Sequence, residues 1–166
     1  MTESARKVCM LGDFGVGKTS LVSRFVHNTF SDKYLTTVGV KVDSKLVGLE
    51  AGSKLKLVIW DIAGKGVLDA SSQNYLRGAT GLLLVADGTR EASLRMALSL
   101  LMQAREVLTD PAVVLMVNKL DLVDRWEVAS ATLAELRRSV PLFETSAQTG
   151  DGVEPAFAEL AKRLIS

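Results

Sequence analysis

Short apolar runs alternate with longer amphipathic stretches along this chain. The runs lie at residues 7–11, 81–86, 112–117 and 142–144, and each has the length of a strand. The stretches between them repeat apolar residues at the spacing of one helix face. Strands that alternate with helices are typical of a mainly parallel sheet with helices on both faces. The pattern therefore predicts an α/β fold.

Two of the amphipathic stretches carry apolar stripes that should pack against the sheet. The stripe after Thr89 consists of Leu94, Ala97, Leu98, Leu101, Ala104 and Leu108. The stripe of the last segment consists of Val153, Phe157, Leu160 and Leu164, and Pro155 falls in its first turn, where proline is tolerated.

Residues 38–60 alternate with a period of two instead. Apolar or small residues at 40, 42, 44 and 46 alternate with Lys41, Asp43 and Lys45, and a second run from Lys54 alternates lysine with leucine. This predicts an antiparallel hairpin at a sheet edge, with lysines that point outward and discourage pairing with another chain.

Taken together, these patterns predict one domain over residues 1–166. It has three layers, a six-stranded sheet with an antiparallel edge strand at 38–49, and about five helices.

Composition limits the partners and the compartment. The chain has 166 residues, 48% of them apolar, which is enough for one core. Its formal charge of +1 gives no field that would attract nucleic acid. A single cysteine, Cys9, excludes an internal disulfide and favours a reducing, cytoplasmic compartment. No apolar run is long enough to span a membrane, and no site for lipid attachment is visible, so we expect no intrinsic membrane anchor unless a modified tail is missing.

Residues 12–19 have the sequence GDFGVGKT, a complete phosphate-loop motif between an apolar run and a helical pattern. Its glycines let the backbone N–H groups surround a polyphosphate, Lys18 adds a positive charge, and the Thr19 hydroxyl is a ligand for Mg²⁺. The residues expected to contact the phosphates are Asp13, Phe14, Gly15, Val16, Gly17, Lys18, Thr19 and Ser20.

The sequence NKLD at residues 118–121 predicts which base is bound. It follows the run at 112–117, at the edge where parallel sheets bind ligands. The Asp121 carboxylate accepts hydrogen bonds only, so it suits the N–H donors of guanine and would stay unsatisfied against adenine. The alternative is that Asn118 and Asp121 cap a helix or loop.

Residues 60–64 have the sequence WDIAG at the end of the hairpin. Asp61 is placed to hold Mg²⁺ through a water molecule, and Gly64 lets a backbone N–H approach the terminal phosphate. Alone this motif is weak, because an aspartate that starts a turn explains it equally well. Its place in the order of motifs strengthens the functional interpretation.

Together these segments, with Thr36-Thr37 and Thr145-Ser146-Ala147, resemble the guanine-nucleotide motifs of Ras-superfamily small GTPases, closest to the Rab branch. The resemblance implies a P-loop NTPase G domain in which Phe30 packs against guanine and Tyr34 covers the phosphates. It also implies that Thr37 supplies a second Mg²⁺ ligand and a backbone N–H to the γ-phosphate. Near the base, it places Lys119 along the ring, the Ala147 N–H on the guanine oxygen, and Ser146 and Gln148 alongside.

The resemblance further implies a monomeric switch that binds GTP or GDP with Mg²⁺. Segments 30–40 and 62–76 would respond to the γ-phosphate, and effectors would contact residues 36–42 and 61–75 in the GTP form. Exchange-factor and activating proteins would also act there, with no role for nucleic acid.

Three residues depart from the family pattern. One of them, Gln148, replaces the lysine that usually ends the last motif, and the expected loss is small because the backbone makes the base contact there. Lys65 stands where a glutamine usually orients the attacking water, and an ammonium group cannot accept a hydrogen bond from that water. Phe14 replaces a small residue and would crowd the entry of an activating arginine, unless its ring lies flat against the loop after Gly64. The expected catalytic residues are Lys18, Thr37, Gly64 and Lys65, with slow hydrolysis. A GTP-loaded scaffold with negligible hydrolysis is the alternative. A P-loop nucleoside kinase is disfavoured, since no arginine-rich lid is visible.

Overall fold

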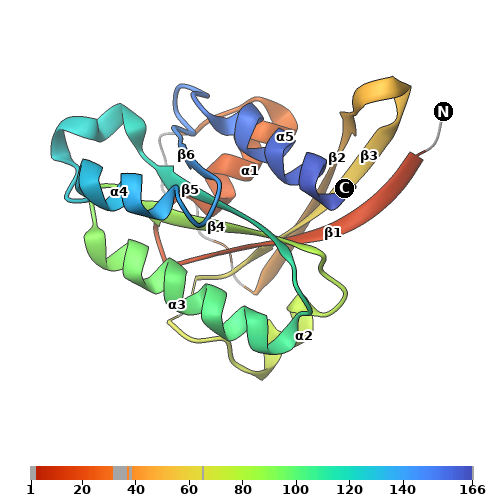
Figure 1. The fold of residues 1–166 in the computed structure, drawn as a ribbon, viewed down its shortest axis with the longest axis horizontal. Coiled ribbons are helices and arrows are strands. Elements are labelled where there is room, and N and C mark those ends of the chain that lie inside the picture. The colour runs from red at the N-terminus through yellow and green to blue at the C-terminus, as the bar shows by residue number, and fades with distance from the viewer. Residues whose placement is uncertain (1–2, 32–36, 38, 65, 166) are drawn as a thin grey trace.

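A six-stranded sheet lies between two layers of helices (Figure 1). The computed structural model describes residues 3–31, 37, 39–64 and 66–165. The strands are β1 (Glu3–Gly12), β2 (Val40–Gly48), β3 (Lys54–Ile62), β4 (Gly81–Asp87), β5 (Ala112–Asn118) and β6 (Leu142–Glu144). The helices are α1 (Lys18–His27), α2 (Ala70–Leu76), α3 (Glu91–Val107), α4 (Ser130–Leu136) and α5 (Val153–Leu164), with 3₁₀ turns at Glu50–Gly52 and Leu120–Arg125.

The strand order is β2-β3-β1-β4-β5-β6, and every neighbouring pair is parallel except β2 with β3. All seven residues of β4 are buried, as expected for a central parallel strand covered on both faces. The predicted fold class, with its antiparallel edge strand, is therefore confirmed. β1 is longer than the predicted run because it pairs with β3 from Glu3 onward.

Two hydrophobic cores lie on the two faces of the sheet. Figure 1 shows α1 and α5 on one side and α2 and α3 on the other. In the first core, the rings of Phe25 and Phe157 stack with centroids 3.9 Å apart. In the second, α3 buries Leu94, Ala97 and Leu101 as predicted, and α4 adds Leu133.

The edge strand β2 departs from the prediction over part of its length. Val42 and Leu46 are exposed, whereas Asp43 and Lys45 are half-buried. The Lys45 ammonium group donates to the Phe25 carbonyl at 2.7 Å and lies 4.3 Å from the centroid of that ring. The expectation of outward lysines is therefore wrong for Lys45, because its long stem covers the end of α1. It holds for Lys41 on β2 and for Lys54 and Lys56 on β3, which are exposed.

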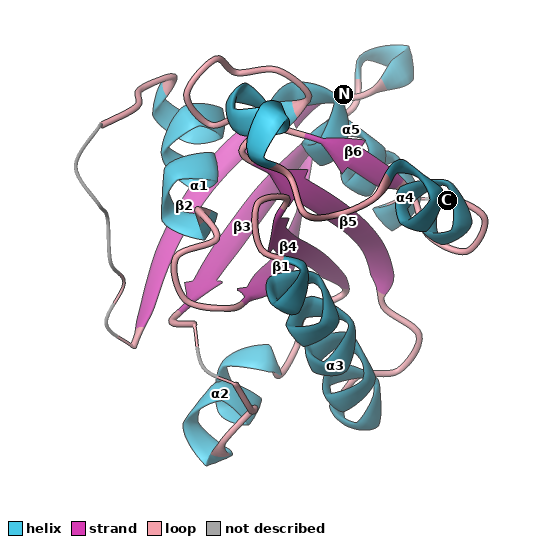
Figure 2. Cartoon of the chain, turned by 90° about the vertical axis from the view of Figure 1, so that its left-hand side faces the viewer, coloured by secondary structure: helices cyan, strands magenta, loops and turns pink. Residues whose placement is uncertain are grey.

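The carboxyl ends of the parallel strands lie together at one edge of the sheet, which faces the viewer in Figure 2. Loops from β1, β3, β4, β5 and β6 therefore meet there, the usual ligand-binding edge of an open parallel sheet. None of the described helices combines the length and apolar character needed to cross a bilayer.

Candidate functional site

A cavity of about 340 Å³ opens at this edge of the sheet. Segments far apart in the sequence, which follow β1, β3, β5 and β6, line it together. The lining residues are Phe14, Gly15, Gly17, Lys18, Thr19, Ser20, Phe30, Ser31, Thr37, Asp61, Gly64, Asn118, Lys119, Asp121, Leu122, Ala147 and Gln148.

The loop between β1 and α1 forms one end of this cavity. Gly17 has a φ of 101°, a backbone conformation that favours glycine, and α1 starts at the next residue. A Cβ at Gly17 would also collide with the side chain of Asn118. Glycine is thus required for two separate reasons, and the N-terminus of α1 points into a site where backbone N–H groups favour an anion.

The Lys18 side chain is 7% exposed and lines the cavity. Its ammonium group donates to the carbonyl oxygens of Gly12 at 3.1 Å and Asp13 at 3.2 Å. Burial lowers the pKa of Lys18 below 10.5, although the charges of Asp61 and Asp13 oppose that shift. Both hydrogen-bond acceptors are neutral, so a bound phosphate would supply the opposite charge that favours the ammonium form.

Thr19, Thr37 and Asp61 form a polar cluster beside Lys18. The Asp61 Oδ2 accepts hydrogen bonds from the Thr19 hydroxyl at 2.6 Å and the Thr37 hydroxyl at 3.0 Å, and the two hydroxyls also contact one another. Asp61 is 1% exposed, and its Oδ1 is buried without a hydrogen-bond partner.

This cluster fits Mg²⁺. Its donors are the hard oxygen ligands that the ion prefers, and the unpartnered Oδ1 of Asp61 offers an acceptor for a bound water. Among the described residues there is no group of three or more histidine, cysteine or acidic side chains that would hold a metal alone. One carboxylate and two hydroxyls instead match the manner in which Mg²⁺ binds together with a substrate's phosphates.

Asn118 joins the phosphate loop to the other end of the cavity. It is 2% exposed, its Nδ2 donates to the Val16 carbonyl at 3.0 Å, and its Oδ1 accepts from the Thr145 hydroxyl at 3.1 Å. The Asp121 carboxylate is exposed at the cavity, and its Oδ1 accepts from the Ser146 hydroxyl at 2.7 Å. Ser146 thereby fixes the orientation of a carboxylate that has acceptor capacity left for a ligand.

Arg24 in α1 holds the loop that carries Ala147 and Gln148. Its Nε donates to the Ala147 carbonyl at 2.8 Å and one terminal nitrogen donates to the Gln148 carbonyl at 2.6 Å. Because both carbonyl oxygens accept hydrogen bonds from Arg24, the backbone of residues 147 and 148 is held in one orientation at the cavity wall. This role is not predictable from the sequence, because an arginine in an amphipathic helix that bonds to a loop looks the same there as an arginine exposed to solvent.

Gly64 packs directly against the phosphate loop. A Cβ at Gly64 would lie 2.6 Å from the backbone nitrogen of Phe14 and 2.8 Å from its Cα. The contact is therefore between two backbones, and the Phe14 side chain remains 54% exposed. The alternative that the Phe14 ring lies flat against the loop after Gly64 stays a prediction, because Lys65 of that loop lies outside the described residues.

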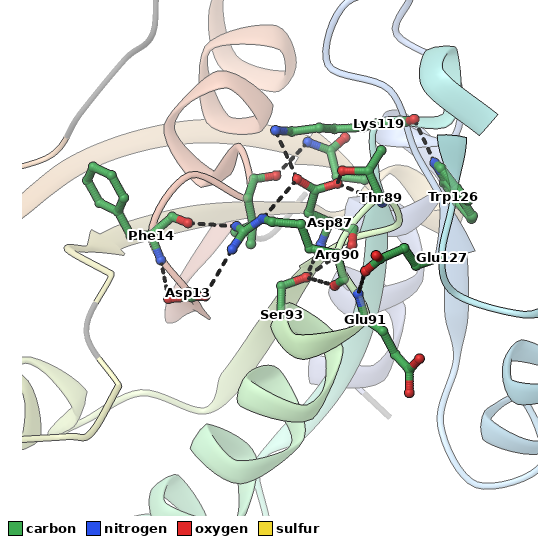
Figure 3. A network of polar contacts seen from close by, with 12 residues as sticks. Asp13, Phe14, Asp87, Thr89, Arg90, Glu91, Ser93, Lys119, Trp126 and Glu127 are labelled. Atoms are coloured by element: carbon green, nitrogen blue, oxygen red, sulfur yellow. Dashed lines mark hydrogen bonds and ion pairs between the residues drawn. The ribbon is translucent and has the colours of Figure 1, made fainter. Parts of the chain in front are cut away.

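Asp87, at the end of β4, is a buried acceptor that organises the neighbouring loops (Figure 3). It accepts from the backbone N–H and hydroxyl of Thr89 at 2.9 and 2.6 Å, and its Oδ2 lies 3.0 Å from the Lys119 ammonium group. Burial alone would raise the pKa of Asp87, but the hydrogen bonds from Thr89 and Lys119 outweigh it and lower the pKa below 3.8.

Trp126 fixes the backbone of the NKLD segment. Its indole N–H donates to the Lys119 carbonyl at 2.8 Å, and Lys119 has a φ of 74°, an uncommon conformation for a residue with a side chain. The ring packs so closely on Gly88 that a Cβ there would collide with it. Trp126 is thus half-buried and supports the backbone of the site.

The structure brings most of the predicted site residues together. Asp13, Val16 and Ser146 do not line the cavity but lie directly behind residues that do. Tyr34 and Lys65 lie outside the described residues. The residues that the sequence did not identify are Ser31, Leu122, Arg24, Asp87 and Arg90.

Comparison with known proteins gives consistent matches. A model described as the Ras family matches residues 7–166. Ras-related protein Rab-30 from Homo sapiens is 37% identical over 163 residues, which cover 96% of this chain and 80% of the relative. Ras-related protein Rab-13 from Canis lupus familiaris is 33% identical over 162 residues, which cover 96% of this chain and 79% of the relative.

Proposed function

Since this chain belongs to the Ras family, it is a Rab-like, GTP-binding GTPase of the switch type, and we propose that it performs this function at the cavity described above. In this proposal GTP lies with its base beside Asp121 and its phosphates beside Lys18. The nucleotide-binding roles of the cavity residues are those given by the sequence motifs.

One observation carries the proposal. A single cavity joins a buried lysine at a helix N-terminus to a fixed carboxylate, and these groups suit the two chemically different ends of a guanine nucleotide. Asn118 supports the same assignment, because it bonds to Val16 at the phosphate end and to Thr145 at the base end.

Thr19, Thr37 and Asp61 would hold Mg²⁺ in this site. When bound there, the ion supplies positive charge that neutralises the phosphate oxygens. The chain's own contribution is to orient the two hydroxyls and the carboxylate, and to place the Lys18 ammonium group in a water-poor environment, where its charge acts more strongly.

Hydrolysis is proposed to be slow. Lys65 carries a donor-only group where a water-orienting glutamine is usual, and the exposed Phe14 ring occupies the rim by which a partner's arginine would enter. We expect Lys65→Gln to accelerate single-turnover GTP hydrolysis by at least about tenfold. Lys56→Gln, at an exposed site on β3, is the matched control. Equal rates for wild type and Lys65→Gln would refute the proposed effect of Lys65.

Effectors are proposed to contact residues 36–42 and 61–75 in the GTP form. Within these segments Val42 is 47% exposed and Val67 is 62% exposed, and apolar side chains left in solvent suit a protein partner. Exchange and activating proteins would act on the same region, with the chain itself as a monomer.

Calorimetry with GTP, GDP and ATP in the presence of Mg²⁺ tests the nucleotide assignment. We expect GTP and GDP to bind at least 100-fold more tightly than ATP, since an unsatisfied carboxylate opposes adenine. Asp121→Ala should weaken GTP binding, whereas Asp124→Ala, an exposed aspartate three residues away, should not. Equal affinity for ATP and GTP would overturn the assignment. In the single-turnover hydrolysis assay, tight GTP binding without detectable phosphate release would instead favour the scaffold alternative.

A further inference from the structure

Arg90, at the start of α3, reaches across to the phosphate loop (Figure 3). One terminal nitrogen of its guanidinium group donates to the Phe14 carbonyl at 2.8 Å. The other lies 3.2 Å from the Asp13 Oδ2. These contacts join residues that are 76 and 77 positions apart in the sequence.

The backbone of Arg90 is locked by its own hydrogen bonds. Its N–H donates to the Asp87 carbonyl at 2.9 Å, and its carbonyl accepts from the Ser93 N–H at 3.0 Å and the Ser93 hydroxyl at 2.7 Å. The Glu127 carboxylate accepts from the next N–H, that of Glu91, at 2.9 Å. The backbone of Arg90 is therefore fixed, and its planar guanidinium fork loses less side-chain freedom per hydrogen bond than a lysine ammonium group would.

The same guanidinium also contacts the base end of the site through Asp87. The Arg90 Nε lies 3.4 Å from the Asp87 Oδ2, which is also the partner of the Lys119 ammonium group. A continuous chain of contacts thus runs from Phe14 through Arg90 and Asp87 to Lys119. Along this chain the charged side chains are those of Asp13, Arg90, Asp87 and Lys119, which alternate in sign. The carboxylates of the buried Asp87 and the half-buried Asp13 therefore each lie beside a cation.

Charge compensation matters because Asp13 lies in the loop that would surround a polyphosphate. A carboxylate there repels the phosphates, and the repulsion grows with the charge of the nucleotide. Arg90 offsets that charge, and its bond to the Phe14 carbonyl also holds the peptide next to it in one orientation.

We propose that Arg90 is a positioning residue of the nucleotide site. It holds the phosphate loop and the NKLD segment in fixed positions relative to each other, and it favours binding of the triphosphate over the diphosphate. This inference rests on the proposed function, since it concerns the same cavity. Arg90 does not line the cavity and acts through Phe14, Asp13 and Asp87.

The test measures release of fluorescently labelled GTP and GDP from the intact chain by stopped flow. Arg90→Ala should release GTP at least about tenfold faster than wild type, because hydrogen bonds to charged groups are lost, and should accelerate GDP release less. Arg90→Lys should recover part of the difference, since lysine keeps the charge but lacks the planar fork. Arg95→Ala is the matched control, because Arg95 lies on the same helix and its ion pair with Glu91 is at the surface.

A second variant separates charge compensation from simple loss of folding. In the Arg90→Ala background, Asp13→Asn should slow GTP release again, because it removes the uncompensated carboxylate. Equal acceleration for GTP and GDP with no effect of Asp13→Asn would overturn the inference, as would release from Arg90→Ala within twofold of wild type. A wild-type chain that binds no GTP would overturn the proposed function itself, and a normal wild type with an unaltered Arg90→Ala would overturn this inference alone.

Discussion

Asn118→Ala should lower the stability of the nucleotide-free protein substantially. The amide is 2% exposed and bonds to the Val16 carbonyl at 3.0 Å and to the Thr145 hydroxyl at 3.1 Å. Both partners belong to residues with 0% exposure, so truncation leaves a buried acceptor and a buried hydroxyl unsatisfied. At about 1–3 kcal/mol for each unsatisfied group, the free energy of unfolding should fall by roughly 2–6 kcal/mol.

That loss is large for a protein of this size. Domains are typically stable by about 5–15 kcal/mol, and about 1 kcal/mol corresponds to roughly 2–4 °C in Tm at this chain length. Urea unfolding and thermal unfolding, both followed by circular dichroism without nucleotide, measure the change. Asn74→Ala, at an exposed asparagine in α2, is the control and should change stability by no more than about 0.5 kcal/mol.

A double-mutant cycle then tests whether Asn118 and Thr145 act together. Thr145→Val removes one partner alone, so the double variant should be less destabilised than the sum of the two single variants. Additive effects, or an Asn118→Ala variant that loses less than about 1 kcal/mol, would refute the reasoning that Asn118 links the two ends of the site.

Three further predictions follow from the same structure. Because burial lowers the pKa of Lys18 and a bound phosphate should raise it, GTP binding near the ordinary lysine pKa of 10.5 should take up protons. Calorimetry in buffers of different ionisation enthalpy should detect a larger uptake for the wild type than for Lys18→Arg, and equal uptake by the two proteins would contradict this. Gly64→Ala should slow GTP hydrolysis and cost about 1–3 kcal/mol of stability, since its Cβ would overlap the Phe14 backbone. Gly66→Ala, whose Cβ would meet the Met96 side chain at an ordinary 3.5 Å, should change unfolding little. Asp87 has a lowered pKa, so its ionised form stabilises the fold at neutral pH and that contribution disappears as the pH falls below about 3.8; Asp87→Asn should show a shallower acid loss in urea unfolding.

The sequence predicted those features that depend on local chemistry. Continuous apolar runs at 81–86 and 112–117 gave the central strands β4 and β5, because strands covered on both faces need no alternation. The phosphate loop and the NKLD segment were identifiable because glycine, lysine and aspartate at fixed spacing have few other uses. The structure places both of them at one cavity.

Features that depend on contacts between distant elements were not predictable in this way. The alternation along β2 does not show which face turns inward. Lys45 turns inward because it packs on Phe25, whereas Lys41 on the same strand stays exposed. Arg90 is similar, because nothing local distinguishes it from Arg95 five residues later. Arg90 bonds to the phosphate loop, whereas Arg95 pairs with Glu91 at the surface. The difference arises because the turn at Asp87 places the start of α3 beside the phosphate loop. A positioning role of this kind is a property of the tertiary arrangement, so substitutions at Arg90 and Arg95 should affect nucleotide release differently although their local sequences look alike.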